Sequence, residues 1–413
     1  MRPNRFDRQL RIEGWNQQLL ESAKIGVVGD DDLLASLYIM SASALGINHI
    51  VALAPVLDSM LVEVAQKLNR RFSLTHVEGF YTHPAMADLF NACDLIVDLS
   101  HYGLANKLLL EKGYRQKRPV VRGLCYEKNG TQGFKVFTYI KGREWQDLKQ
   151  IISPHNFPID HFDDGVLDTI ISGIILEETK NLLMKQDVSD NLISYSRKQL
   201  KNSNNQKKIL VVGSGALGIF VGLGLAYSGF RQMTFMDPDV VEMTNLNRQI
   251  FFYGAVGESK AKTLSTKLNV LFGIDSTHQV AYFDRNSDIS SFDVVFDCVD
   301  NFESRIVLSE KCAGQGKMLI SGGTSPDAGQ AVIYNPMKNS VTPSELLGLY
   351  DIIEKRSPET YQRERAACIY QPDPSVIMTN QITAGFMVDS FRMLLDGQEP
   401  KNIFYDSTSN TKF

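Results

Sequence analysis

The stretch Ile209-Leu-Val-Val-Gly213-Ser-Gly215-Ala-Leu-Gly218 joins an apolar run to a glycine-rich turn and then to small and apolar residues. This order is typical of a parallel strand that turns tightly into a helix. Gly213 permits the turn, Gly215 lets the backbone approach a ligand, and Gly218 lets the helix pack on the strand. The free amide groups at the start of such a helix favour phosphate. The stretch therefore predicts a nucleotide-binding unit without choosing the nucleotide.

A weaker copy of the same pattern lies in the first half of the chain. The run IGVVG at 25–29 corresponds to ILVVG at 209–213, and DLIVD at 94–98 corresponds to DVVFD at 293–297. Further pairs follow in the same order: strands at 119–123 and 318–322, and late helices at 166–183 and 376–395. Strands that alternate with helices predict an α/β fold, here two tandem Rossmann-like domains with mainly parallel sheets.

The domain boundaries follow from the spacing of the two copies. We expect a first domain over residues 1–185 and a second over 207–413. Residues 186–206 are polar and rich in Asn and Ser, which is typical of a linker. Gly29 and Gly213 are 184 positions apart, but Asp98 and Asp297 are 199 apart, so the second copy is longer by 199 − 184 = 15 residues. The additional residues fall around 239–259, a polar loop that the first copy lacks.

Composition excludes several classes of protein. The 413 residues include 43 basic and 47 acidic side chains, with a net charge of −4 and no basic tail, so nucleic acid is not expected as a partner. The charged N-terminus lacks an apolar signal core, and no apolar run reaches membrane-spanning length. The five cysteines form no C-x-x-C pair, so we expect no structural zinc and a reducing, cytoplasmic location.

Asp237 extends the nucleotide prediction. It ends the strand after the glycine turn, 24 residues beyond Gly213, where a ribose-binding acid belongs. The glycine loop and this acid together leave NAD, FAD and ATP open.

The polar loop and two later residues favour ATP. Asn245, Asn247, Arg248 and Gln249 supply hydrogen-bond donors, and Lys260 follows at the start of a helix. Two cations near a nucleotide suit a triphosphate better than the diphosphate of NAD.

Asp300 completes this candidate site. It lies at the carboxyl end of the expected strand at 294–299, the sheet edge at which ligands bind. A carboxylate facing phosphates would be repulsive unless Mg²⁺ lay between them.

Taken in order, Asp237, Asn245-Leu-Asn-Arg-Gln249, Lys260 and Asp300-Asn-Phe-Glu-Ser-Arg305 resemble the signature of the ubiquitin-activating and ThiF/MoeB adenylating family. The resemblance covers most of residues 5–30 and 207–396. It implies an ATP site made of Gly213, Gly215, Ala216, Leu217, Gly218, Asp237, Asn245, Asn247, Arg248, Gln249, Lys260, Asp300 and Asn301. It also implies that the matching asparagine of the polar loop, Arg248 and Lys260 hold the triphosphate. By the same resemblance Asp300 holds Mg²⁺, and a protein's C-terminal carboxylate attacks the α-phosphate.

The first copy is expected to be inactive. Its glycine turn is replaced by Asp30-Asp31-Asp32, whose carboxylates would repel phosphate. However, Arg5-Phe-Asp-Arg8-Gln-Leu-Arg11 resembles the family's opening helix, from which an arginine reaches the ATP of the partner domain. By this resemblance Arg8 is catalytic, and the two domains are related by a pseudo-twofold axis. One chain would then complete the active site, without requiring a dimer.

Cys368 is the candidate nucleophile for a later step. It lies in a segment, about 336–375, that resembles the family's crossover loop, and Arg363 and Arg365 could lower its pKa. The resemblance implies a thioester with a small β-grasp, ubiquitin-like protein ending in glycine, and transfer onward to a conjugating enzyme. Cys298 and Cys312 are expected to be buried packing residues.

Three alternatives remain open. The first is adenylation without a thioester, in sulfur-carrier or microcin-type peptide-tailoring biosynthesis. The second is an NAD-dependent oxidoreductase, against which Arg248, Lys260 and Asp300 argue. The third is a non-catalytic scaffold of two Rossmann-like units, which would require that both sites be inactive.

Overall fold

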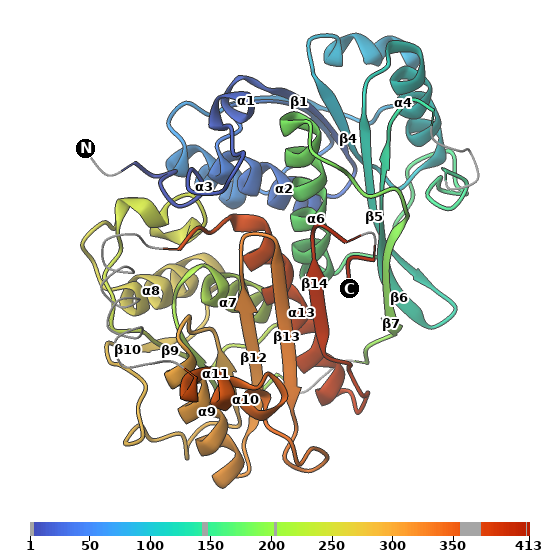
Figure 1. The fold of residues 1–413 in the computed structure, drawn as a ribbon. Helices are drawn as coiled ribbons and strands as arrows, with labels where there is room; N and C mark the ends of the chain where they lie inside the picture. The colour runs from blue at the N-terminus through green and yellow to red at the C-terminus, as the bar shows by residue number, and fades with distance from the viewer. Residues whose placement is uncertain (1–3, 143–147, 202–204, 356–372, 410) are drawn as a thin grey trace. The chain divides into compact units, whose positions relative to one another are not determined.

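The computed structural model describes residues 4–142, 148–201, 205–355, 373–409 and 411–413, and these form two compact units. We call Gly14–Leu200 with Asp406–Phe413 the first unit, and Met1–Glu13 with Lys201–Tyr405 the second unit. Each unit contains one seven-stranded sheet (Figure 1). The two-domain α/β prediction is confirmed, and each sheet is mainly parallel.

The sheet of the first unit has the order β3-β2-β1-β4-β5-β6-β7. Neighbours from β3 to β5 are parallel, and β6 and β7 are antiparallel additions. Its strands are β1 (Lys24–Gly29), β2 (His49–Ala54), β3 (Ser73–Glu78), β4 (Leu95–Leu99), β5 (Val120–Lys128), β6 (Thr131–Tyr139) and β7 (Ile193–Lys198). The chain leaves β1 toward one side of the sheet and returns at β4 on the other, which makes the β1–β4 edge a topological switch point.

Helices cover both faces of this sheet. α2 packs on α3 and α6, and α6 lies against β5 and β6, whereas α4 packs on β4, β5 and η1. Asp31 begins α2 by accepting hydrogen bonds from the amides of Leu33 and Leu34. The helices are α1 (Gln17–Ser22), α2 (Asp32–Leu45), α3 (Ser59–Leu68), η1 (Pro84–Phe90), α4 (Gly103–Gln116) and α6 (Gly165–Met184).

The second sheet repeats the first, with the order β10-β9-β8-β11-β12-β13-β14. Its switch point lies between β8 and β11, and both of these strands are buried along their whole length. Continuous burial is expected for parallel strands covered on both faces. The strands are β8 (Ile209–Val212), β9 (Met233–Met236), β10 (Thr277–Gln279), β11 (Val294–Asp297), β12 (Met318–Thr324), β13 (Ala328–Tyr334) and β14 (Ile403–Asp406).

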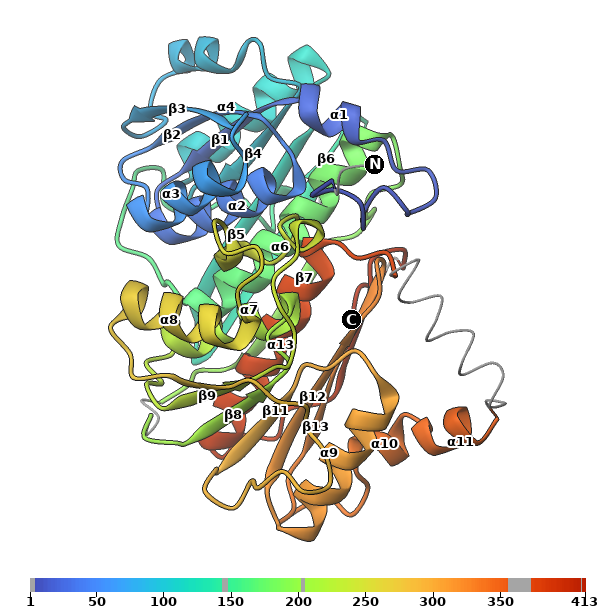
Figure 2. The same ribbon diagram turned by 90° about the vertical axis from the view of Figure 1, so that its left-hand side faces the viewer.

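Helices also cover both faces of the second sheet, as Figures 1 and 2 show. α13 packs on α7, β12 and β13, whereas α9 contacts β11 and β12 together with α10 and α11. The helices are α7 (Ala216–Tyr227), η2 (Met243–Asn245), η3 (Ile250–Phe252), α8 (Lys260–Phe272), α9 (Phe302–Gly314), α10 (Pro343–Leu346), α11 (Leu349–Glu354) and α13 (Ile377–Leu395). No helix in the described part of the chain has the length and apolar character needed to span a bilayer.

Three segments differ from their sequence-based expectations. Part of the expected linker, Ile193–Lys198, is strand β7, which pairs with β6 because side chains on its two faces alternate in burial. Residues 5–14 form turns instead of the expected opening helix. Within the expected crossover loop, α10 forms because Thr342 and Glu345 make a capping box around Pro343. Cys368 lies outside the described residues.

Candidate functional site

The glycine loop of the second unit lies at the switch point and packs against the exit of β11. Gly213 has φ +95°, and a Cβ there would lie 2.5 Å from the carbonyl oxygen of Cys298. A Cβ on Gly218 would lie 2.0 Å from the oxygen of Gly213. A Cβ on Gly215 would meet only Gln249 Nε2, at 3.7 Å. Gly213 and Gly218 are therefore required by packing, whereas Gly215 leaves room over the start of α7.

Asp237 ties the end of β9 to this loop. Its carboxylate accepts hydrogen bonds from the amides of Ser214 at 2.6 Å and Asp239 at 2.8 Å. Burial raises the pKa of Asp237, although Lys260 and these two amides oppose the shift. The predicted ribose acid is thus held in a fixed orientation at the sheet edge, beside the glycine loop.

Residues 245–249 of the polar loop are buried, and their side chains make different contacts. Asn245 is the third residue of η2 and forms a capping box with the N-cap residue Glu242 through a reciprocal pair of hydrogen bonds. Asn247 Nδ2 donates to Gln9 Oε1 at 2.9 Å, and Arg248 Nη1 donates to Asn247 Oδ1 at 2.8 Å. Gln249 Oε1 is buried and has no hydrogen-bond partner among the described residues. Asn245 and Asn247 therefore make hydrogen bonds within the protein, whereas the side-chain oxygen of Gln249 could accept a hydrogen bond from a ligand.

Two guanidinium groups meet beside this loop. Arg248 is 6% exposed, and burial together with the nearby Arg8 lowers the pKa of Arg248 to about 9. Burial also lowers the pKa of Arg8, against the opposing fields of Glu242, Asp373 and Asp300. Arg8 Nη1 donates to the carbonyl oxygen of Asp373 at 2.7 Å. The predicted pair of N-terminal arginine and loop arginine is thus brought together within one unit.

Lys260 and Asp300 come from the start of α8 and from the loop after β11. Lys260 is the first residue of α8, and its Nζ lies 2.8 Å from Asp239 Oδ2. Asp300 is exposed in the loop after β11, which ends at Asp297 and not at residue 299 as expected. Asn301 caps α9 by accepting a hydrogen bond from Ser304 N at 2.8 Å. Asp300 and Asn301 are both exposed, whereas Lys260 is only partly exposed.

A buried ion pair behind the loop has no role in the sequence-based site. Asp297 Oδ2 accepts from Ser321 Oγ at 2.6 Å and lies 3.3 Å from Arg305 Nη1. Arg305 Nη2 also donates to the carbonyl oxygen of Val299, which fixes the backbone that leads to Asp300. The signal was present in the sequence as Asp297 at the end of a buried strand, followed eight residues later by an arginine on the next helix.

The first unit carries the same carboxylate with its cation on a different element. Asp98 pairs in register with Arg122 on β5, and their side chains lie 3.5 Å apart with no exposed surface. The helix position eight residues after Asp98 is Asn106, whose Nδ2 donates to Asp98 at 3.0 Å. In the second unit the register partner is Ser321 and the helix residue is Arg305. The arginine thus lies on the neighbouring strand in the first unit and on the following helix in the second unit, and a neutral side chain occupies the other position in each.

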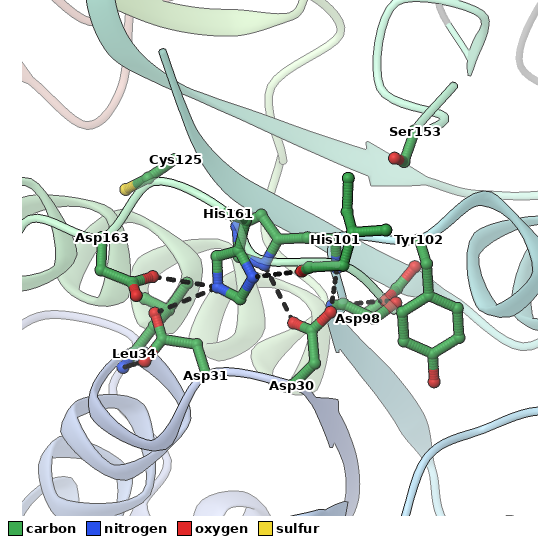
Figure 3. A network of polar contacts seen from close by, with 12 residues as sticks. Asp30, Asp31, Leu34, Asp98, His101, Tyr102, Cys125, Ser153, His161 and Asp163 are labelled. Atoms are coloured by element: carbon green, nitrogen blue, oxygen red, sulfur yellow. Dashed lines mark hydrogen bonds and ion pairs between the residues drawn. The ribbon is translucent and has the colours of Figure 1, made fainter. Parts of the chain in front are cut away.

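The switch point of the first unit is filled by its own side chains (Figure 3). Asp30 Oδ1 lies 2.9 Å from His101 Nδ1, and the His101 amide donates to Asp30 Oδ2 at 2.8 Å. His161 stacks on His101 with ring centroids 3.7 Å apart. Asp31 is turned into α2 as its cap. Asp30 and Asp31, two of the carboxylates that we expected to repel phosphate, therefore lie in a polar cluster that includes the two imidazoles.

The four described cysteines are buried. Burial raises the pKa of Cys93 and of Cys125, whose Sγ lies 3.1 Å from Asp168. Burial also raises the pKa of Cys298 well above its usual range and that of Cys312 to about 12. The prediction that Cys298 and Cys312 are packing residues is confirmed, and none of these four thiols is suited to nucleophilic attack.

The fold and this loop arrangement define a class of nucleotide-binding α/β protein, and comparison with known proteins gives the family. The ThiF family model matches residues 188–411, more than half of the chain, so the protein belongs to the ThiF family. The resemblance seen in the sequence is confirmed.

Curated relatives are adenylyltransferases by name. The "Adenylyltransferase and sulfurtransferase MOCS3" of Arabidopsis thaliana is 33% identical over 159 residues, which are 35% of this chain and 34% of that protein. Its counterpart in Drosophila sechellia is 30% identical over 213 residues, 47% of each chain. The chain thus spans less than half the length of these two relatives. Among solved structures, Escherichia coli MccB with ATP is 19% identical, with a TM-score of 0.42 over 50% of this chain and 62% of that one.

Proposed function

We propose that the second unit binds ATP with Mg²⁺ and adenylates the C-terminal carboxylate of a small ubiquitin-like, β-grasp protein ending in glycine. The observation that carries the proposal is the convergence of Arg8 and Arg248, where burial together with the nearby Arg8 lowers the pKa of Arg248 to about 9. Burying like charges together is unfavourable unless an anion lies between them. The negative charge of a bound triphosphate would offset the repulsion between the two guanidinium groups.

The surrounding groups support the same ligand. Gly215 leaves space at the N-terminus of α7, where backbone amides and the helix dipole favour phosphate. Asp237 lies at the neighbouring strand end, in a position suited to ribose hydroxyls. Ser214 Oγ and Gln249 Oε1 are buried without hydrogen-bond partners among the described residues, and both could bind a nucleotide. Lys260 would exchange its pairing with Asp239 for a phosphate.

Asp300 is the residue that would hold Mg²⁺. Its exposed carboxylate follows β11, and its field reaches both Arg8 and Arg248, which suits a position between cations and phosphates. Bound there, the ion would supply charge neutralisation for the triphosphate. The protein's own contribution is placement, because Arg305 and Asp297 fix the backbone that precedes Asp300.

The proposed reaction joins a carboxylate to the α-phosphate. A carboxylate oxygen of the substrate attacks the α-phosphorus, the bond to the bridging oxygen breaks, and pyrophosphate leaves with that electron pair. Arg8 and Arg248 would stabilise the charge that develops on the departing phosphates. Positioning and neutralisation account for the chemistry, so no side chain needs to act as a base on an already ionised carboxylate.

We further propose a thioester on Cys368, followed by transfer to a conjugating enzyme, in a cytoplasmic setting. The second candidate is sulfur-carrier activation, which the names of the curated relatives favour because they include sulfurtransferase. Peptide tailoring without a thioester uses the same ATP site. These candidates share the adenylation step and differ in the group that then receives the activated carboxylate.

The test is Mg²⁺-dependent exchange of pyrophosphate into ATP by the full chain. It should occur with a β-grasp protein ending in glycine and be lost in Asp300→Asn. Asp327→Asn, an equally exposed carboxylate between β12 and β13, is the matched control and should retain exchange. Exchange that persists in Asp300→Asn would overturn the assignment of the metal residue. Binding of NAD in preference to Mg·ATP would overturn the proposed nucleotide.

A further inference from the structure

The polar cluster of the first unit lies where a nucleotide would bind if that unit had retained its site. Asp30 and Asp31 follow β1, His101 follows β4, and His161 and Asp163 come from the segment before α6 (Figure 3). The ligand-type atoms of Asp31, His161 and Asp163 all lie within 4.8 Å of one another, and so do those of Asp30, His101 and His161. His161 belongs to both groups. Adenylation, as proposed for the second unit, uses none of these residues.

His161 is oriented as metal-binding histidines are. Its Nδ1 lies 3.4 Å from the carbonyl oxygen of Ile159, which can only accept, so Nδ1 carries a proton. Nε2 faces the carboxylates of Asp163 and Asp31, so a metal ion there would take the place of a second ring proton. A backbone carbonyl behind one nitrogen and a ligand before the other is the usual arrangement around metal-bound imidazole.

The distances around Nε2 fit a small tetrahedral ion. His161 Nε2 is 2.9 Å from Asp163 Oδ1 and 4.0 Å from Asp31 Oδ2. Zinc bonds of about 2.1 Å place neighbouring tetrahedral ligands roughly 3.4 Å apart, a value between these two distances. His161 Nε2 is buried, and Asp163 is the nearer of the two carboxylates that face it. Small side-chain rotations would bring all three ligands onto one ion.

The charges of the cluster also favour a cation. The side chains of Asp30 and Asp31 are each 3% exposed, and Asp163 adds a third carboxylate. The rings of His101 and His161 are stacked with their centroids 3.7 Å apart, so positive charge on both rings at once would be unfavourable. His101 is itself nearly buried, and its Nε2 has no hydrogen-bond partner among the described residues. A divalent ion would balance the carboxylates without charging both rings.

We propose that Asp31, His161 and Asp163 form a zinc-binding site, with the Asp30–His101 pair packed behind it. Imidazole and carboxylate ligands suit Zn²⁺, and three protein ligands leave a fourth position for water. Asp163 is 57% exposed, so this position faces solvent. The first unit would thus bind a metal ion at the switch point that corresponds to the proposed nucleotide site of the second unit.

The experiment uses the full chain and zinc alone. Purified protein is stripped with chelator, dialysed against metal-buffered Zn²⁺ without ATP, and analysed for bound metal. We expect one zinc per chain. Asp163→Asn and His161→Ala should each weaken binding by more than the roughly 10–100-fold that loss of an outer-shell partner costs. His155→Ala removes an exposed imidazole from the same segment and should bind zinc as the parent does.

Several outcomes would overturn the site. The first is the absence of stoichiometric zinc in the parent protein. The second is an unchanged zinc affinity in both Asp163→Asn and His161→Ala. The third is that Cys368→Ala loses zinc while His161→Ala retains it. Because Asp163 is largely exposed, Asp163→Asn should fold normally, and circular dichroism checks this. Asp300→Asn should retain the zinc, so failure of the adenylation proposal leaves this test unaffected.

Discussion

Asn247 Nδ2 donates a 2.9 Å hydrogen bond to Gln9 Oε1, joining residues 238 positions apart in the sequence. Both side chains are fully buried in the second unit. The oxygen of the same Asn247 amide accepts from Arg248. One side chain therefore fixes both the segment that carries Arg8 and the loop arginine beside it.

Replacing Asn247 or Gln9 with alanine should weaken Mg·ATP binding without removing any proposed phosphate contact. A buried hydrogen bond contributes about 0.5–1.5 kcal/mol, so each change should lower affinity roughly 2- to 10-fold. Calorimetric titration of the two single variants and the double variant checks this. Because the two residues share one bond, the double variant should lose less than the product of the two separate effects. Strictly independent effects would mean that the contact does not position the arginines.

The glycine loop offers a matched pair of substitutions. Gly218→Ala should destabilise the second unit, since its Cβ would lie 2.0 Å from the oxygen of Gly213. Gly215→Ala should fold normally, because the nearest atom lies at 3.7 Å, yet it should reduce ATP affinity by narrowing the phosphate approach. Thermal unfolding and nucleotide titration separate the two effects. Normal ATP affinity in a folded Gly215→Ala would count against phosphate at this loop.

Arg122→Met should strongly destabilise the first unit. The change leaves the carboxylate of Asp98 buried without a cation, which costs about 3–5 kcal/mol. Trp15 belongs to the first unit, so its fluorescence follows the unfolding of that unit in urea. We expect the midpoint to fall by more than about 1 M. Arg115→Met, which removes an exposed guanidinium from α4, should leave the midpoint nearly unchanged.

Cys368→Ala should retain pyrophosphate exchange and lose any reductant-sensitive adduct with the protein substrate. The four described cysteines are buried thiols with raised pKa values, so none is a ready substitute. Non-reducing electrophoresis after incubation with Mg·ATP and the substrate shows the adduct. Its survival in the variant would assign the nucleophile elsewhere, whereas its absence from the parent would favour adenylation without a thioester.

The sequence predicted the elements whose signals are local. The glycine turn, the capped start of α8 at Lys260 and the long helices near 166–183 and 376–395 depend on spacing within a few turns of chain. It misplaced Ile193–Lys198, because a polar edge strand is recognised only by the neighbour with which it pairs. It did not predict the contact of Asn247 with Gln9, since the partner of an amide cannot be deduced from the neighbouring sequence.

The sequence by itself determined the architecture and the family. Both depend on local signals, namely the alternation of apolar strands with helices and the order of the polar residues at the strand ends. Tertiary structure alone decided which side chains serve the protein and which remain for a ligand. Asn247 binds Gln9, Arg305 binds Asp297, and Asp30 and Asp31 lie beside two histidines from distant segments. The physical reason is that hydrogen bonds and charges are satisfied in space, between residues whose separation in sequence carries no record of their contact.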